Sequence, residues 1–196
     1  SSPQLWILEV LSVAVLLAFR SLIDHVTAVA EALRLSLAEG RIMVAKIVGR
    51  DISNLDESGV VRSTVESAAE NLSDGFIAPL FWYILLGLPG LFAYKVINTA
   101  DSMIAHKSDR YEEFGWATAK LDDIVNWVPA RLSAMIILLS NLKFDKIHIV
   151  LRDAKLHRSP NAGWPETAMA TLLNIALAGP RSYNGVDGSD PYINPE

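Results

Sequence analysis

The sequence predicts an all-α fold: a polytopic integral membrane protein whose helices include a broken or re-entrant apolar hairpin. Residues 75–94 (GFIAPLFWYILLGLPGLFAY) contain no charged side chain over 20 positions, which is about the length a helix needs to cross the hydrocarbon core of a bilayer. Charged residues make up only 20% of the chain, below the roughly 25% usual for soluble domains. A helical soluble protein with a large core is the alternative that these observations leave open.

Composition excludes several classes of protein. The chain has no cysteine, so a disulfide framework and any zinc site with cysteine ligands are ruled out. A net charge of −5 argues against a nucleic-acid partner, which requires a basic surface. The 196 residues predict one membrane domain covering 1–196. Because the chain begins without methionine and closes in a turn-rich segment, we expect it to be an internal fragment of a longer protein.

The first half is expected to alternate apolar and amphipathic helices. An apolar run with one charge, Glu9, precedes an amphipathic helix in which apolar residues recur at helical spacing. This helix is expected to continue past Gly40 to Arg50. The expected elements of this half are the apolar run Leu5 to Phe19, the helix Arg20 to Leu37 with its continuation Ala38 to Arg50, the loop Asp51 to Ser58, and the helix Val60 to Asp74.

The second half is expected to be mainly helical as well. Pro129 marks a break or a new helix start, and Pro165 lies near the first turn of the last helix. The β-branched run Ile147 to Leu151 suits a strand or a helix equally. The other expected elements are helices over Lys95 to His106, Trp116 to Asn126, Leu132 to Leu142 and Thr167 to Gly179, a charged turn over Ser108 to Phe114, and a loop over Arg158 to Pro165.

Polar motifs flank the uncharged run on both sides, and their positions indicate whether the run crosses a membrane once or turns back. If the run crossed a membrane once, the two motifs would lie on opposite faces and could not share a site. Gly87, Pro89 and Gly90 fall inside the run, and proline with glycine breaks helices. We therefore predict a broken hairpin over Phe76 to Tyr94 that brings both motifs to one side.

The motif before the run is acidic. Arg62, Glu66, Glu70 and Asp74 are spaced by four and so share one helical face. A solvated face with an ion pair is the plainer interpretation. A magnesium site is the functional one, since Mg²⁺ favours one or two carboxylates together with substrate phosphates. Asn71 adds an amide beside that face.

Further polar residues follow the run. Lys95, Asn98, Asp101 and Ser102 share a face, which suits either an interfacial helix end or a functional site. Asp122 and Asp123 precede Asn126 and Arg131, and could bind a metal or serve as ordinary helix charges. Cations that could neutralise phosphate come later in the chain, with His157, which alone is more often structural: Arg152, Lys155 and Arg158.

Standard nucleotide and hydrolase motifs are absent. The sequence contains no G-x-x-x-x-G-K-[ST], G-x-G-x-x-G, H-E-x-x-H or G-x-S-x-G pattern. The spacing of the polar residues thus predicts a membrane-embedded helical protein with an acidic, amide-rich site.

Five ordered motifs resemble the adenosylcobinamide-phosphate synthase family of cobalamin biosynthesis, the CobD/CbiB type. Together they extend from about Gly49 to Tyr183. The matching stretches are Gly49-Arg50-Asp51 with Leu55-Asp56; Glu66-Ser67, Glu70-Asn71, Ser73-Asp74-Gly75 and Ala78 to Phe81; Tyr94-Lys95, Asn98-Thr99 and Asp101-Ser102-Met103; Phe114 to Ala117, Leu121-Asp122-Asp123, Asn126 and Pro129-Ala130-Arg131; and Arg152-Asp153-Ala154, His157 and Ser159 to Glu166.

The resemblance implies a membrane enzyme that joins adenosylcobyric acid to aminopropanol or its phosphate through an ATP-dependent amide bond. It implies ATP and Mg²⁺ as cofactors and the corrinoid and the amine as substrates. A homo-oligomer is possible, but the sequence does not fix the oligomeric state. The catalytic candidates are Asp51, Glu70, Asp74, Asp101, Asp122 and Asp123, with Glu70, Asp74 and Asp101 as metal ligands. The substrate-binding candidates are Asn71, Lys95, Asn98, Ser102, Asn126, Arg131, Arg152, His157 and Asn161.

The expected location is the inner cell membrane with several spans. Of the 17 Lys and Arg residues, 16 lie between Arg20 and Arg158, which favours a cytoplasmic polar side. Two alternatives to a ligase remain: a non-catalytic AmpE-like regulatory or sensor protein on a similar scaffold, and a transporter. The missing internal repeat disfavours a transporter.

Overall fold

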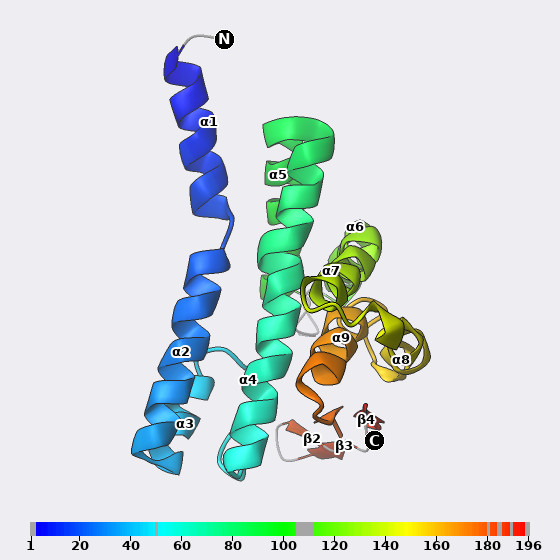
Figure 1. Cartoon of the computed structure of the whole chain (residues 1–196). Coiled ribbons are helices and arrows are strands. Elements are labelled where there is room, and N and C mark those ends of the chain that lie inside the picture. The colour runs from blue at the N-terminus through cyan, green and yellow to red at the C-terminus, as the bar shows by residue number, and fades with distance from the viewer. Residues whose placement is uncertain are drawn as a thin grey trace.

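The computed structural model describes residues 3–49, 51–104, 112–179, 181–183, 186–188 and 190–194. These residues are mainly helical (Figure 1). Helices α1 and α2 follow one another along one side, α4 and α5 form the central column, and α6 to α9 lie on the other side. The helices are α1 Pro3–Leu16, α2 Phe19–Leu35, α3 Leu37–Val44, α4 Glu57–Leu72, α5 Ala78–Ile104, α6 Glu112–Val125, α7 Trp127–Ser140, α8 Ile147–Asp153 and α9 Gly163–Leu173, with a π-helix η1 Ser73–Ile77 and 3-10 helices η2 Phe144–Lys146 and η3 Ala154–Leu156.

The amphipathic helix does not continue to Arg50, so that part of the prediction is wrong. It ends at Leu35, because Ser36 is extended (φ −167°, ψ 160°) and its hydroxyl accepts the backbone N–H of Glu39 at 3.1 Å. Ser36 is therefore the N-cap of α3, in the S-x-x-E pattern of a capping box. The chain reverses here, and α2, α3 and α4 share a core of Val29, Val44 and Val60.

The broken apolar hairpin is confirmed. Gly87 has φ 68° and ψ −155°, which divides α5 into an outgoing limb, residues 78–86, and a return limb, residues 88–104. Figure 1 shows the chain turning at the top of the central column. The hydroxyl oxygen of Tyr94 lies 3.0 Å from the backbone oxygen of Asp74, whereas a straight helix would separate these residues by about 30 Å.

A second break separates α6 from α7. Asn126 interrupts the helical path, and Gly115–Val125 and Trp127–Ser140 meet at 46°. Pro129 lies in the first turn of α7, as expected of a residue that starts a helix. Ile147 to Leu151 is helical within α8. The expected charged turn falls mostly outside the described residues, as do His106 and Arg50.

The last expected helix lies earlier in the chain than predicted, because it begins at Gly163, inside the expected loop, and ends at Leu173 rather than Gly179. Four short strands follow it. Helix α9 ends at Leu173 because Asn174 adopts a left-handed conformation (φ 55°), a common helix stop. Strand β1 Leu177–Ala178 pairs antiparallel with β4 Tyr192–Ile193, and β2 Arg181–Tyr183 with β3 Val186–Gly188. The Glu66 carboxylate accepts the Ala178 backbone N–H at 2.7 Å and fastens β1 to α4.

Large apolar side chains remain exposed on the long helices. Trp6 and Val15 on α1 are 63% and 79% exposed, and Ile84 near the hairpin tip is 73% exposed. Two helices of the described chain are long and apolar enough to cross a membrane, Trp6–Leu35 and Glu57–Met103; a third would be the bent pair α6 and α7. In contrast to these exposed surfaces, the largest cluster of buried apolar side chains lies between α7, α8 and α9, around Leu138, Val150 and Ala168.

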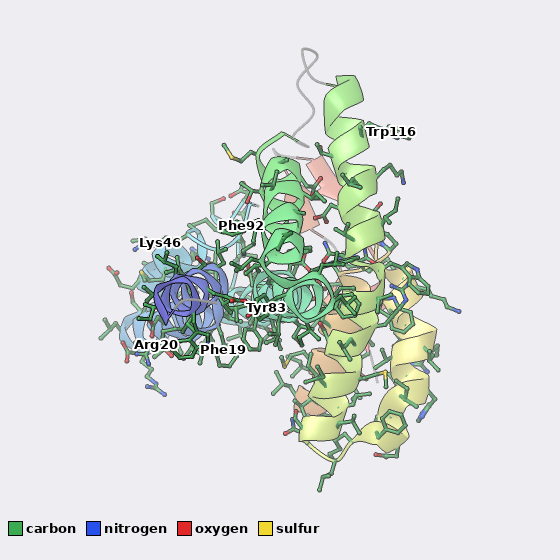
Figure 2. The ribbon with its side chains drawn as sticks, turned by 90° about the horizontal axis from the view of Figure 1, so that it is seen from above. Phe19, Arg20, Lys46, Tyr83, Phe92 and Trp116 are labelled. Carbon is green, nitrogen blue, oxygen red and sulfur yellow. The ribbon has the colours of Figure 1, made fainter. Side chains whose placement is uncertain are left out.

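The two long apolar segments are joined where both are interrupted. The backbone N–H of Ala18, between α1 and α2, donates to the oxygen of Gly75 in η1 at 3.0 Å. The rings of Phe19 and Phe76 lie next to this bond, 4.8 Å apart. Higher up, the hydroxyl of Tyr83 donates to the carboxylate of Glu9 at 2.9 Å. Figure 2 shows Tyr83 between α1 and the centre of the molecule.

Candidate functional site

The site begins at the π-helix that carries Asp74. In η1 the backbone N–H of Ala78 donates to the oxygen of Ser73, five residues earlier. This wider turn changes the direction in which the following side chains point, and such turns are frequent at functional sites. Here it leaves the Asp74 backbone oxygen available to the return limb of the hairpin.

Tyr94 connects the hairpin to α6 and α7. Its side chain is 1% exposed, and its hydroxyl oxygen lies 3.0 Å from Asp74 O and 2.9 Å from Asn126 Oδ1. Asn126 Nδ2 in turn donates to Asp122 Oδ2 at 2.9 Å, and Asn98 Nδ2 approaches Asp122 Oδ1 at 3.4 Å. Both oxygens of the Asp122 carboxylate are therefore oriented by amides.

Acidic side chains from three segments gather around Asp74. Its carboxylate interacts electrostatically with those of Glu70, Asp101 and Asp122, and also with the Lys95 ammonium. In the part of the chain that the structure describes, no three His, Asp or Glu side chains form a group that could hold a metal ion alone. Magnesium often takes only one or two carboxylates and completes its shell with phosphate oxygens and water, so Glu70, Asp74 and Asp101 as metal ligands stay a prediction.

A cation, Arg131, is linked through Asn161 to the end of α6, the helix that carries Asp122. The Arg131 guanidinium is placed between two indole rings, 4.2 Å from the centroid of Trp127 and 4.5 Å from that of Trp164, a stacked arrangement that favours arginine. Its Nη1 donates to Trp127 O at 2.6 Å and lies 3.3 Å from Asn161 Oδ1. Asn161 Nδ2 donates to Asp123 O at 2.8 Å, so the arginine is linked to the end of α6.

The guanidinium is held in place without being neutralised. Among the described residues, no carboxylate lies within ion-pair distance of Arg131. A fixed, half-buried guanidinium with remaining N–H groups is suited to an anionic group such as a phosphate or carboxylate. The site thus combines an oriented carboxylate, Asp122, with a positioned cation one helical break away.

Comparison with known proteins decides the family. The sequence model of one family, described as "CobD/Cbib protein", matches residues 1–196. The chain belongs to the CobD/CbiB family. Three curated relatives, each named "Cobalamin biosynthesis protein CobD", come from Brucella suis biovar 1 (54% identical, covering 96% of this chain and 60% of the relative), a Sinorhizobium species (54%, 98% and 62%) and Rhodobacter capsulatus (52%, 90% and 57%).

The chain thus spans about three-fifths of the length of the CobD proteins it matches. No solved structure matches it. The CobD/CbiB resemblance that the five motifs predicted is confirmed by both the family match and these relatives.

The structure brings most of the predicted site residues of this family member together. They come from α4 and η1, the return limb of α5, the end of α6, the start of α7, and the segment before α9. The members of this cluster are Glu70, Asp74, Lys95, Asn98, Asp101, Asp122, Asn126, Arg131 and Asn161. Asp123 contributes only its backbone oxygen, because its carboxylate pairs with Lys120 at 3.6 Å. The hairpin accounts for this convergence, because it returns residues 94–101 to the level of Asp74.

Other predicted residues have local partners away from this cluster. Asp51 accepts both the N–H and the hydroxyl of Ser53, at 2.9 and 2.7 Å, and these bonds lower the pKa of its carboxyl. The Ser102 hydroxyl donates to Asn98 O within its own helix. The Asn71 amide donates to Ser67 O within α4.

Arg152 and His157 also have partners within the C-terminal part. Arg152 donates to both carboxylate oxygens of Asp153 at 2.6 and 3.1 Å, which lowers the pKa of the Asp153 carboxyl. The ring Nδ1 of His157 accepts the backbone N–H of Ser159, and its Nε2 lies 3.5 Å from the Glu166 carboxylate. Both contacts stabilise the segment that precedes α9.

The sequence analysis missed three aromatic residues of the site. Tyr94 was part of a quoted motif but not a site candidate, although a tyrosine at the end of an apolar run has a hydroxyl that needs a partner when buried. Trp164 also lies inside a quoted motif, and Trp127 lies between two quoted parts of another; each is near a proline. Trp127 lies four positions before Arg131 on α7, a spacing that could have indicated the contact. Trp164 lies 33 positions after Arg131, and no local spacing pattern reveals that pairing.

Proposed function

We propose that this CobD/CbiB chain acts in cobalamin biosynthesis as the main part of a membrane-bound ligase. The ligase would join adenosylcobyric acid to aminopropanol or its phosphate and release adenosylcobinamide or its phosphate. The names of the relatives support the pathway. The observation that carries the proposed chemistry is the convergence of Asp122, Asp74 and Arg131 through the apolar hairpin and the break at Asn126.

Forming an amide from a carboxylic acid and an amine requires removal of one carboxylate oxygen and of protons from the amine. ATP with Mg²⁺ would supply the activation of that oxygen as a leaving group. The acidic side chains around Asp74 would hold the metal, and the positioned Arg131 would bind the phosphate or a carboxylate of the corrinoid. Such fixed charges stabilise charge that develops during the reaction.

Asp122 is suited to accept the proton of the attacking ammonium. Its carboxylate is partly exposed, and amides of Asn98 and Asn126 fix both of its oxygens. A base must lie within hydrogen-bond reach of the proton it removes, and an oriented carboxylate loses no rotational freedom when the amine arrives. Tyr94 is a positioning residue, because it contacts Asn126 rather than the open side of Asp122.

We also propose that the chain lies in the inner membrane as a multi-pass protein. The exposed apolar surface of α1 and of the hairpin tip supports insertion, since large exposed apolar patches mark surfaces that meet lipid or another protein. The acidic cluster and Arg131 lie toward the polar end of the hairpin, and the distribution of Lys and Arg favours the cytoplasm for that side.

The test is a reconstitution with purified protein in nanodiscs. Adenosylcobyric acid, aminopropanol or its phosphate, ATP and Mg²⁺ are supplied, and the corrinoid amide is quantified by mass spectrometry. Asp122→Asn keeps the shape of the side chain but removes its basicity, so we expect a loss of about 10²-fold or more in rate. Asp145→Asn is the matched control, because Asp145 is exposed in η2, away from the cluster.

Alanine at Asp101 and at Glu70 tests the predicted metal side of the cluster. Both variants are expected to lose activity, and raised Mg²⁺ should restore part of it. Unchanged synthesis in both would refute the assignment of these residues. If wild-type protein consumes no ATP and no corrinoid under any condition, a non-catalytic AmpE-like sensor becomes the better interpretation.

A further inference from the structure

A polar cavity lies between α2, the segment after α3, and α4, and none of its lining residues belongs to the acidic cluster. It has a volume of about 400 Å³, within the range of small-molecule sites. We call it the α2–α4 pocket. Figure 2 shows Lys46, which lines it, on the α2 side of the molecule and Trp116 of α6 on the other side. Its polar lining is formed by Ser21, His25, Lys46, Gly49, Ser67 and Asn71.

The charge of this pocket is positive, although the chain as a whole carries −5. Lys46 lines it, and none of the lining residues is acidic. The nearby carboxylates are engaged elsewhere: Asp24 pairs with Arg20 at 3.0 Å, and Asp51 accepts two bonds from Ser53. Within the described ranges, no carboxylate lies within ion-pair distance of the Lys46 ammonium.

Two further groups of the pocket are free to meet a ligand. No oxygen in the described part of the chain accepts the Gly49 N–H, and a Cβ added at Gly49 would meet no atom within 4 Å. His25 Nδ1 lies 2.7 Å from Ser21 O. Because a carbonyl oxygen only accepts, Nδ1 carries the hydrogen, and Nε2 remains to accept from a hydroxyl, or to donate when the ring is protonated.

Other lining groups are fixed and give the pocket a firm shape. The Ser67 hydroxyl donates to Ile47 O at 3.0 Å, which ties the loop after α3 to α4. The Asn71 amide nitrogen is held by Ser67, at 2.8 Å from its backbone oxygen. Ala18 also lines the pocket, and its backbone N–H donates to Gly75 O in the π-helix.

We propose that the α2–α4 pocket binds a phosphate group, through the Lys46 ammonium, the Gly49 N–H and His25. An ammonium and a backbone N–H supply the donors that phosphate oxygens need, and neutral His25 Nε2 can accept from a protonated phosphate oxygen. The pocket lies where apolar α1 gives way to the charged start of α2. The phosphate therefore comes from a phospholipid headgroup at the membrane surface or from a free phosphate compound.

This site is separate from the proposed ligase cluster, and only the lipid source depends on the proposed membrane insertion. The experiment uses the whole chain, purified in detergent and examined by native mass spectrometry with two probes: phosphatidylglycerol and inorganic phosphate. Lys46→Gln removes the charge at an exposed position, and Lys143→Gln is the control at another exposed lysine, after α7. Lys46→Arg restores the charge.

We expect Lys46→Gln to weaken binding of one probe by about tenfold or more, the usual worth of a hydrogen bond to a charged group, while Lys46→Arg recovers it and Lys143→Gln changes nothing. Binding of phosphatidylglycerol that inorganic phosphate does not displace identifies a lipid headgroup. Binding of inorganic phosphate in the absence of lipid identifies a small ligand. If neither probe binds, or if binding is equal in wild type and Lys46→Gln, the proposal is overturned, whatever the outcome of the ligase assay.

Discussion

Gly87 at the tip of the apolar hairpin gives the sharpest test of the fold. Its φ of 68° with ψ of −155° lies in a region open essentially to glycine alone. A Cβ at this position would meet its nearest atom, Pro89 Cδ, at 3.8 Å, which is ordinary contact. The penalty of Gly87→Ala is therefore backbone strain rather than collision, and such strain costs about 1–3 kcal/mol.

The matched control is Gly49→Ala, where an added Cβ meets open space and no positive φ is present. Alanine reduces the freedom of the unfolded chain equally at both positions, so the difference between the two variants isolates the strain. For a chain of this size, about 2 kcal/mol corresponds to a decrease of about 4–8 °C in Tm. Differential scanning fluorimetry in detergent, using the tryptophan emission, measures it.

Equal melting temperatures for the two variants would refute the hairpin geometry, because a straight helix through residue 87 would be stabilised by alanine. A decrease confined to Gly87→Ala would support it.

Three further changes test other parts of the structure. Tyr94→Phe removes the hydroxyl whose one hydrogen is shared between Asn126 Oδ1 and Asp74 O. It is expected to lower the free energy of unfolding by about 1–3 kcal/mol, measured by the same fluorimetry. Gly90→Ala places a Cβ 2.5 Å from Trp82 O, a backbone collision that should lower Tm more than Gly87→Ala does. Because Arg152 depresses the pKa of the Asp153 carboxyl, the stability it provides is present above the ordinary pKa of about 3.9 and lost as pH falls through the depressed value. Wild-type Tm should therefore fall more steeply than that of Asp153→Asn between pH 5 and pH 2. These two pH values lie on either side of the ordinary pKa, each about one unit or more from 3.9. Parallel curves for the two proteins would contradict this.

Much of the helical architecture was predictable because it depends on local signals. These signals each lie within one to five helical turns of sequence. They are the uncharged run, the glycines and proline within it, and the four-residue spacing of Glu66, Glu70 and Asp74. The hairpin followed from one further requirement, that the polar motifs on its two sides share a site. Where prediction went wrong, a single residue decided the outcome: Ser36 capped a new helix, and Asn174 ended the last one early.

The finer design of the site was not predictable from spacing. The π-helix contains one extra residue in a single turn, and the periodicity of apolar residues in the sequence does not reveal an insertion of that size. The links of Tyr94 to Asn126 and of Arg131 to Trp164 join segments that are 32 and 33 positions apart. Arg152 pairs with its neighbour Asp153, a contact that the spacing of the cations does not reveal, and its role as a phosphate ligand stays a prediction.

The bond between Ala18 N–H and Gly75 O has a mechanical consequence. Both long apolar segments are interrupted at the same level, one between two helices and the other by a wider helical turn, and a single hydrogen bond with one ring pair fastens the interruptions together. A tilt of α1 therefore pulls on the turn that carries Asp74. With α1 inserted in a membrane as proposed, the thickness of that membrane would set the angle of α1 and so act, through this hydrogen bond, on the turn that carries Asp74.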